Sequence, residues 1–341
     1  MLIFDEKKYV KDPVVSVIVI TYNQEKYIEQ CINSILEQIV SFPYELIISD
    51  DHSTDATSRI CMQIQNKYPE LIKLYIQDKN RGLIGNYSDV ISLCKGSYIA
   101  QVAGDDFWIY SKKLQDQYDL LESNKSIGLC YTNTLTCADN GVTNNTALLD
   151  KSDLPHSFIH QLFKAAYISP NSWMYRRDVF NKFVELKSWF TDESLAVALD
   201  FFYNSNVYYM DKITAVYRVH SNSLATQIDP YKKWKYEYGV CMMQLHYAKK
   251  YNVSEDAMLK LKIQNYINLI SKAIEASQLE FIKETIEFFR EHDMELCFFV
   301  DEEKRHISYM HSYNNILNSY AYRVGKLIVK PFSFLRKLLG R

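Results

Sequence analysis

The chain has 341 residues, 48% of them hydrophobic, and is long enough to bury one substantial core and a smaller second one. Its 39 basic and 41 acidic residues leave a formal net charge of −2, which argues against a general affinity for nucleic acid. The first residues, MLIFDEKKYVKDP, lack the apolar stretch of a signal peptide, and no 18 uncharged apolar residues run together. A cytoplasmic protein is therefore expected.

The seven cysteines are scattered along the chain without any CxxC pair. Several of them lie in apolar runs, where a thiol behaves as a small hydrophobic group. We expect structural cysteines in a reducing compartment, with no metal or redox role. They are Cys31, Cys61, Cys94, Cys130, Cys137, Cys241 and Cys297.

The first hundred residues alternate between strand and helix patterns. The run VVSVIVITY at 14–22 is typical of a strand covered on both faces, and apolar residues at 27–38 recur at helical spacing. Strands are expected at 14–22, 45–49, 72–77 and 97–103, and helices at 27–38, about 53–67 and 84–94. Such alternation predicts right-handed βαβ crossovers and an α/β fold with a mainly parallel sheet.

The rest of the chain is mixed and then helical. We expect helices at 111–123 and 192–203, strands at 127–134, 172–175, 207–210 and 215–219, and a surface loop at 139–153. From residue 231 the pattern is helical almost throughout, with Ser254 as the N-cap of a helix over 255–276. The predicted domain boundary separates an α/β domain at 1–229 from a helical region at 230–341.

Polar clusters follow three of the predicted strands. They are Thr21-Tyr22-Asn23, the run DDHSTD at 50–55 and the run GDDFW at 104–108. Turns favour the same residue types, so one cluster alone would indicate only a turn. Because ligands of parallel sheets bind beyond the carboxyl ends of the strands, three such clusters predict a ligand site at that edge.

The pairs Asp50-Asp51 and Asp105-Asp106 directly follow buried strands. Adjacent carboxylates cost free energy unless a cation or a donor shares the site. Mg²⁺ or Mn²⁺, held by one or two carboxylates with phosphate oxygens and water, is the usual partner in nucleoside diphosphate sites. Neither GxGxxG nor GxxxxGK[ST] occurs, which argues against dehydrogenases and P-loop enzymes. The phosphates are thus expected to be neutralised mainly by metal.

Several ordered motifs resemble the family 2 glycosyltransferases, in particular the bacterial enzymes of surface-polysaccharide assembly. They are VSVIVITYNQEKYIEQCINSILEQ, ELIISDDHSTDAT and NRGLIGNYSDVISLCKGSYIAQVAGDDFW, followed by KLQDQYDLLESNKSIGLCYTN and AVYRVHSNS. The similarity covers about residues 14–223. It implies the GT-A fold, a mainly parallel Rossmann-like sheet with flanking helices, as the catalytic domain at 1–229.

The resemblance implies nucleotide contacts at the strand ends. Thr21 and Asn23 match the nucleotide-contacting turn after the first strand. Asp50 or Asp51 matches the acidic position that accepts a hydrogen bond from the base. Asp105 is expected toward the ribose of the donor.

Between these turns, Asn80 and Asn86 match positions in the loop and helix of the family pattern. The chain departs from many relatives at Ile84-Gly85-Asn86, where they carry an Ala-Arg-Asn run. The arginine contact to diphosphate or base is missing there, and Arg81 is close enough in sequence to replace it.

The resemblance also implies a metal site. Asp106 matches the position that faces metal and diphosphate, and His220 is a second candidate ligand, or a donor to the diphosphate, with Arg218 assisting electrostatically. A lone histidine is more often structural, and this alternative stays open. Trp108 and Trp173 are candidates to stack on a sugar, with core packing as the alternative.

An inverting transfer needs a carboxylate that removes the proton of the acceptor hydroxyl. The segment FTDESL at 190–195 opens a helix where the family places this base, so Asp192 is expected as the base and Glu193 as the alternative. Acidic residues in a first helical turn also stabilise the helix dipole without any catalysis.

The last forty residues are basic. After Glu303 only Lys and Arg carry charge, interleaved with apolar residues from Val324 to Leu339 and interrupted by Pro331. One interpretation is that this basic segment contacts the inner face of the cell membrane, and the other is that it packs on the protein. The cations are Lys304, Arg305, Arg323, Lys326, Lys330, Arg336, Lys337 and Arg341.

The sequence therefore predicts an inverting, metal-dependent transferase that moves a sugar from a nucleoside diphosphate donor to a glycan or lipid-linked acceptor. A UDP-sugar is expected from family frequency, and inversion rests on the resemblance alone. The alternatives are a sugar nucleotidyltransferase, although TYNQEKY lacks the glycine-rich basic loop of that class, and a catalytically inactive nucleotide-sugar-binding scaffold.

Overall fold

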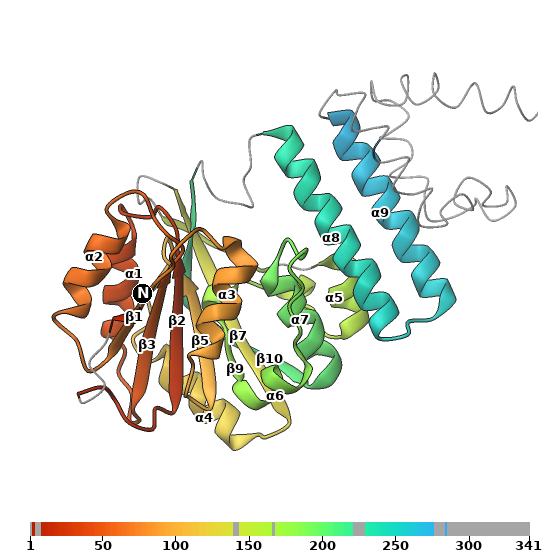
Figure 1. Ribbon diagram of the computed structural model, residues 1–341. Coiled ribbons are helices and arrows are strands. Elements are labelled where there is room, and N and C mark those ends of the chain that lie inside the picture. The colour runs from red at the N-terminus through yellow and green to blue at the C-terminus, as the bar shows by residue number, and fades with distance from the viewer. Residues whose placement is uncertain are drawn as a thin grey trace, which may run out of the picture. The chain divides into compact units, whose positions relative to one another are not determined.

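The structure is a computed structural model that describes residues 2–3, 8–138, 143–165, 168–220, 229–275 and 284. These residues form two compact units: the described residues before 227 together with 242–251, and the described residues of 227–241 together with those after 251. Figure 1 shows the elements in chain order. The N-terminal elements are β1 (Leu2–Ile3), β2 (Val15–Thr21), α1 (Ile28–Leu36), β3 (Tyr44–Asp50), α2 (Thr57–Gln65), β4 (Ile72–Ile76), α3 (Gly82–Ser92), β5 (Tyr98–Ala103), β6 (Phe107–Trp108) and α4 (Lys113–Ser123).

The second half adds the other edge of the sheet and the helices that follow it. Its elements are β7 (Ile127–Ala138), β8 (Thr143–Ala147), η1 (Lys151–Asp153), α5 (Phe158–Lys164), η2 (Pro170–Ser172), β9 (Met174–Arg176), α6 (Arg177–Phe183), α7 (Glu193–Asn204), β10 (Asn206–Val219), α8 (Pro230–Lys250) and α9 (Glu255–Glu275). Helix α8 passes from the second compact unit into the first at residue 242. The predicted boundary at residue 229 stays a prediction.

One mixed sheet of ten strands forms the centre of the first unit, in the order β1-β4-β3-β2-β5-β9-β7-β10-β6, with β8 paired to β7. Strands β4, β3, β2 and β5 pair in parallel, as do β7 and β10, while β1, β6, β8 and β9 pair antiparallel to their neighbours. The parallel strands bring their carboxyl ends to one edge. The α/β prediction is confirmed, and the expected parallel strands are joined by antiparallel ones.

Both faces of the sheet are buried. On β2, Val15, Val17 and Val19 pack in a core with α1, α2 and α4, whereas Ile18 packs in a second core with α3, α6 and α7. This alternation follows from the two-residue period of a strand, and it explains why the whole run is apolar. The six described cysteines are free and buried, and Cys297 lies outside the described residues.

Three local expectations were wrong. The loop expected at 139–153 contains β8, which pairs with β7 although TNNTA shows no apolar alternation, because an edge strand with a polar sequence leaves no periodic signal. The two strands expected at 207–210 and 215–219 are one strand, β10, whose register shifts between Tyr209 and Ile213 and again before Ala215. The short helices α5 and α6 were not expected.

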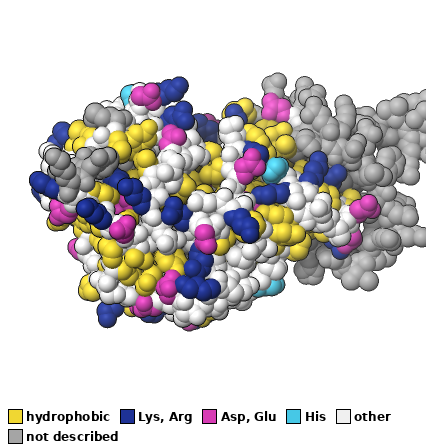
Figure 2. Space-filling model, turned by 60° about the horizontal axis from the view of Figure 1, so that its bottom comes forward, with side chains coloured by type: hydrophobic (Ala, Val, Ile, Leu, Met, Phe, Trp, Pro, Cys, Tyr) yellow, Lys and Arg dark blue, Asp and Glu magenta, His cyan; other side chains and the backbone are white. Residues whose placement is uncertain are grey.

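On the face shown in Figure 2, Lys and Arg side chains are interspersed with Asp and Glu. In the part of the chain that the structure describes, no helix combines the length and the apolar content needed to cross a bilayer. The basic residues after 303, one of whose predicted roles is membrane contact, lie outside the described residues.

A buried ion pair lies at the amino edge of the sheet. The fully buried Glu45 carboxylate of β3 accepts hydrogen bonds from Lys73 Nζ at 2.9 Å, Ser16 Oγ at 2.6 Å, Tyr9 Oη at 3.0 Å and the backbone N–H of Lys95 at 2.7 Å. Burial acts to raise the pKa of Glu45, but the bonds from Ser16 and Lys73 lower it below its ordinary value. The carboxylate therefore joins β2, β3 and β4 as an anion.

Lys73→Met is expected to lower the free energy of unfolding by about 3 kcal/mol, since it leaves the Glu45 carboxylate buried without its cation. Lys125→Met, which removes an exposed pair with Glu122, is the matched control and should cost less than about 1 kcal/mol. Urea unfolding followed by circular dichroism measures both. Equal losses in the two variants would contradict the structural role of the Glu45 pair.

Candidate active site

Predicted site residues from four segments meet at the carboxyl edge of the sheet. Thr21 ends β2, Asp50 ends β3, Asp105 follows β5, and His220 follows β10. The backbone N–H of Asp51 donates to Thr21 O at 2.9 Å, and that of Gly104 donates to Ile20 O at 3.0 Å, so the turns are joined directly beyond the strands. Four segments that are distant in sequence thus share one edge.

The turn after β2 is fixed to the loop after β3. Asn23 has a φ of 53°, a left-handed conformation that asparagine tolerates better than most residues. Its Oδ1 accepts the backbone N–H of Thr54 at 2.8 Å, and its own N–H donates to Ser53 Oγ at 2.9 Å. Thr21 Oγ1 donates to Gln24 Oε1 at 2.7 Å. These bonds make the two turns one rigid wall of the site.

Asp50 and Asp51 are both buried and both engaged by the protein. Asp50 accepts from the hydroxyls of Ser53 and Ser58. Asp51 accepts the backbone N–H groups of Arg81 at 2.6 Å and Gly82 at 2.9 Å. Burial nevertheless raises the pKa of Asp51. The Asp51 carboxylate therefore holds the loop before α3 in place at the sheet edge.

The remaining predicted nucleotide contacts divide into exposed and buried residues. Asn80 and Arg81 are exposed, and Arg81 Nε forms an ion pair with Asp89 Oδ2 at 3.2 Å. Asn86 is buried, where its Oδ1 accepts Ser49 Oγ at 2.5 Å and its Nδ2 donates to Ser49 O at 3.2 Å. In this arrangement Asn86 ties α3 to β3 beneath the edge, whereas Asn80 and Arg81 lie where a ligand can reach them.

Asp105 and His220 form a partly exposed polar pair at this edge. His220 Nε2 lies 2.9 Å from Asp105 Oδ2, and their side chains are 8% and 16% exposed. The imidazole stacks on the Tyr27 ring with 5.3 Å between centroids. Arg218 Nε donates to the backbone carbonyl of Asp105 at 2.9 Å, with its guanidinium 4.6 Å from the Tyr27 ring centroid. A carboxylate and an imidazole are thus held together by an aromatic ring and an arginine.

Asp106 faces the interior. Its Oδ1 accepts the backbone N–H of Arg218 at 2.8 Å, and its Oδ2 accepts Asn171 Nδ2 at 2.9 Å. Burial, and next the charge of Asp105, raise the pKa of Asp106 well above its usual range. Asn171 also accepts Ser169 Oγ at 2.8 Å. Asn171 was not predicted, because a single asparagine in SPNSW matches no motif.

The two candidate bases have different surroundings. Asp192 is the N-cap of α7, and its Oδ1 accepts the backbone N–H of Leu195 at 2.9 Å and Ser194 Oγ at 2.6 Å. Glu193 is only 6% exposed, and burial, followed by the neighbouring Asp192 carboxylate, raises the pKa of Glu193 to about 8. Glu193 is therefore mostly protonated at neutral pH, whereas Asp192 is partly exposed.

Both tryptophans considered for sugar stacking lie in the interior. Trp108 Nε1 donates to Asn171 O at 2.8 Å, and Lys113 Nζ lies 4.4 Å from the Trp108 ring centroid. Trp173 is fully buried in the core beneath α3 and α7. Core packing accounts for both side chains.

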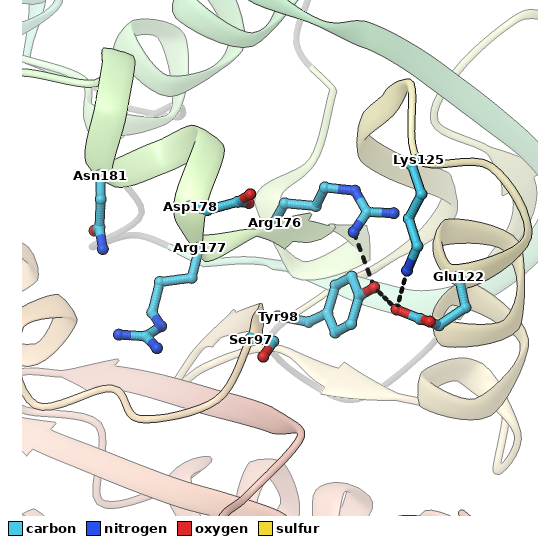
Figure 3. Close-up of a pocket in the computed structure, with 8 residues that line it drawn as sticks. All are labelled: Ser97, Tyr98, Glu122, Lys125, Arg176, Arg177, Asp178 and Asn181. Atoms are coloured by element: carbon cyan, nitrogen blue, oxygen red, sulfur yellow. Dashed lines mark hydrogen bonds and ion pairs between the residues drawn. The ribbon is translucent and has the colours of Figure 1, made fainter.

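A pocket of about 390 Å³ lies at the opposite, amino edge of β5 (Figure 3). Its arginines are engaged by the backbone: Arg176 Nε donates to Ile127 O at 2.9 Å, and Arg177 Nη2 donates to Lys95 O at 3.1 Å. Figure 3 shows the Tyr98 hydroxyl between Arg176 and Glu122. These contacts join β9 and α6 to the ends of neighbouring elements, away from the predicted site residues.

In the described ranges, no group of three or more His, Cys, Asp or Glu side chains is arranged to hold a metal ion. Asp105 and His220 are a pair of potential ligands that face each other at the site edge. A pair suffices where substrate phosphates and water complete the coordination, as is usual for Mg²⁺. The donor set is therefore compatible with a metal bound together with a nucleotide.

Comparisons with known proteins identify the family. The model of glycosyl transferase family 2 matches residues 16–184. An uncharacterised protein of Mycobacterium bovis is 34% identical over 164 residues, 48% of this chain and 46% of that protein, so the chain spans about half the length of this relative. The putative teichuronic acid biosynthesis glycosyltransferase TuaG of Bacillus subtilis is 30% identical over 227 residues, 65% of this chain and 84% of TuaG.

Solved structures show the same architecture. TarS of S. aureus in complex with UDP-GlcNAc has a TM-score of 0.53 at 15% identity, covering 82% of this chain and 92% of that one. The mannosyltransferase PcManGT of Pyrobaculum calidifontis, in complex with GDP-Man and Mn²⁺, has a TM-score of 0.53 at 16% identity, covering 82% and 81%. At these identities the likeness establishes the GT-A fold alone. Together with the family match and the extent of the similarity to TuaG, it shows that the chain belongs to glycosyl transferase family 2.

Proposed function

We propose that the protein is an inverting, metal-dependent glycosyltransferase that moves a sugar from a nucleoside diphosphate donor to a glycan or lipid-linked acceptor. The observation that carries the proposal is the partly exposed Asp105–His220 pair, 2.9 Å apart, at the sheet edge where Thr21, Asn23 and Asp51 also lie. Family membership supports it, as do two fold neighbours solved with nucleotide sugars. A UDP-sugar is our proposed donor.

The nucleotide is proposed to lie against the wall formed by the turns after β2 and β3. Asp51 fixes the loop before α3 through two backbone N–H groups, which leaves Asn80 and Arg81 exposed beside that wall. Arg81 would then supply a cation for the diphosphate or a contact to the base. Asp50 and Asn86 support the wall from beneath, because both are buried and hydrogen-bonded within the protein.

Asp105 and His220 would hold a Mg²⁺ or Mn²⁺ ion, with Asp105 in the place that the motif predicted for Asp106. When bound, such an ion stabilises the negative charge of the leaving diphosphate. The metal role of Asp106 stays a prediction. Since both of its oxygens already accept hydrogen bonds from Arg218 and Asn171, Asp106 is better suited to orient Asp105.

Asp192 is the proposed base. It sits at the first turn of α7, and its hydrogen bonds from Leu195 and Ser194 fix the orientation of the carboxylate. Glu193, the alternative base, is buried, and its raised pKa of about 8 leaves it mostly protonated at pH 7. The Asp192 carboxylate would take the proton of the acceptor hydroxyl as that oxygen attacks the anomeric carbon.

Titration calorimetry with UDP-, GDP-, dTDP- and CMP-linked sugars tests the donor site. We expect one class of donor to bind in the presence of Mn²⁺ or Mg²⁺, and binding to weaken at least tenfold in chelator. Asp105→Asn should reduce this metal dependence, because it removes the charge of the proposed ligand. Failure of the folded protein to bind any of the donors would contradict the proposal.

Asp192→Asn should lower kcat by about 10²–10⁴-fold, the usual range for loss of a general base, with an unchanged Kd for the donor. Glu193→Gln is the neighbouring control and should retain most of the activity near pH 7. Release of nucleoside diphosphate, with a cell-envelope glycan fraction as acceptor, measures turnover. A wild-type protein that binds donor but never turns over would instead indicate the inactive scaffold.

Glu193→Gln should also change how stability depends on pH. The pKa of Glu193 is about 8 in the folded chain, above the ordinary value of 4.5. Stability from the protonated carboxyl is therefore complete below about pH 4.5 and is lost as the pH rises toward about 8. The Tm of the wild type relative to the variant should fall by a few degrees between about pH 5 and pH 9. Parallel Tm curves from scanning fluorimetry would show that Glu193 is not buried as described.

A further inference from the structure

The last ten residues of the first compact unit, 242–251, come from the end of α8 and the turn after it. The sequence assigned them to a separate helical region. Gln244 Nε2 donates to the backbone carbonyl of Leu162, on α5, at 2.6 Å. Tyr251 stacks on Tyr203 of α7 with 3.7 Å between ring centroids and 17° between the planes. This segment is thus packed into the unit that carries the candidate active site.

The central contact of the segment is with Asp200 on α7. The Asp200 side chain is fully buried, and it accepts hydrogen bonds from Lys250 Nζ at 2.6 Å, Tyr247 Oη at 3.1 Å and the Tyr251 hydroxyl. Asn204 Nδ2 donates to the same Tyr251 hydroxyl at 2.7 Å. Three side chains of one segment therefore converge on one buried carboxylate.

The residues just before α7 pack on the same segment. Phe190 lies against His246 and Tyr247, with ring centroids 5.7 and 6.0 Å apart. Thr191 Oγ1 approaches Met243 Sδ at 3.7 Å. The chain is thus supported by α8 on both sides of Asp192, at residues 190–191 before it and at Asp200 after it.

Because a helix is stiff along its axis, a displacement of one of its residues also moves the others. Asp200 lies eight residues after Asp192, which corresponds to about 12 Å along α7 at 1.5 Å per residue. A buried carboxylate that loses its cation is left uncompensated, so the helix must shift or admit water to solvate it. Because a misplacement of about 1 Å at a reacting group can cost about 10²-fold in rate, such a shift would reach the chemistry.

We propose that Lys250, together with Tyr247 and Tyr251, is a positioning residue that holds α7 through Asp200 and thereby sets the place of the Asp192 carboxylate. This rests on the proposed role of Asp192 as base. The end of α8 is then a working part of the transferase, and donor binding at the turns after β2, β3 and β5 does not depend on it.

Lys250→Met in the full chain tests the proposal, with Lys249→Met as the matched control. Both variants lose one cation in the last turn of α8, but only Lys250 pairs with Asp200. We expect Lys250→Met to lower kcat at least tenfold while the calorimetric Kd for the UDP-sugar with Mn²⁺ stays within twofold. Lys250→Arg should recover most of the lost rate, and Lys249→Met should match the wild type.

Hydrogen exchange of α7 gives a second measurement that needs no turnover. The Leu195 N–H is bonded to Asp192 Oδ1, and its exchange should become faster in Lys250→Met than in Lys249→Met. If Lys250→Met does not fold, Tyr251→Phe removes one donor only and should lower kcat about threefold or more. A Lys250 variant with wild-type kcat and exchange would overturn the inference, whereas a wild type that binds donor without turnover would overturn the proposed function itself.

Discussion

The buried carboxylate of Asp106 is the interaction on which the site depends. Its two oxygens accept hydrogen bonds from the backbone of Arg218 at the end of β10 and from Asn171 in η2. Arg218 and Asn171 follow Asp106 by more than one hundred and more than sixty residues. The same contact leaves Asp105 at the edge beside His220. One inward carboxylate therefore fixes the place of the outward one.

The sequence predicted much of this edge. Parallel strands bring their carboxyl ends together, so the residues after β2, β3 and β5 are expected to converge. It could not predict which carboxylate of Asp105-Asp106 faces inward, because that depends on Asn171 and Arg218, whose approach is set by β9 and β10. Tertiary packing also decides that Glu193 is buried while the neighbouring Asp192 is partly exposed. The sequence alone does not show which of two adjacent carboxylates faces the interior.

The fold shows a similar division. Long apolar runs and helical periodicity located β2, α1 and α7 within a few residues, because their burial on a two-sided sheet leaves a clear pattern. The polar edge strand β8 and the short helices α5 and α6 carry no such pattern. The end of α8 was assigned to a separate region because its helical sequence does not reveal that Tyr247, Lys250 and Tyr251 reach a carboxylate on α7.

Strand β10 begins at the amino edge, where Asn206 pairs with Ile127, and ends at the carboxyl edge, where Val219 pairs with Ala138 and His220 follows. Its register shifts once between Asn206 and Val207 and again between Tyr209 and Ala215, around the exposed Asp211 and Lys212, whereas pairing from Ala215 to Val219 is continuous. A homologue can therefore gain or lose a residue near position 211 and keep its histidine in place. A change of one residue after Ala215 would turn every later side chain to the other face. The strand therefore tolerates a change of length most easily at its existing irregularity, away from His220.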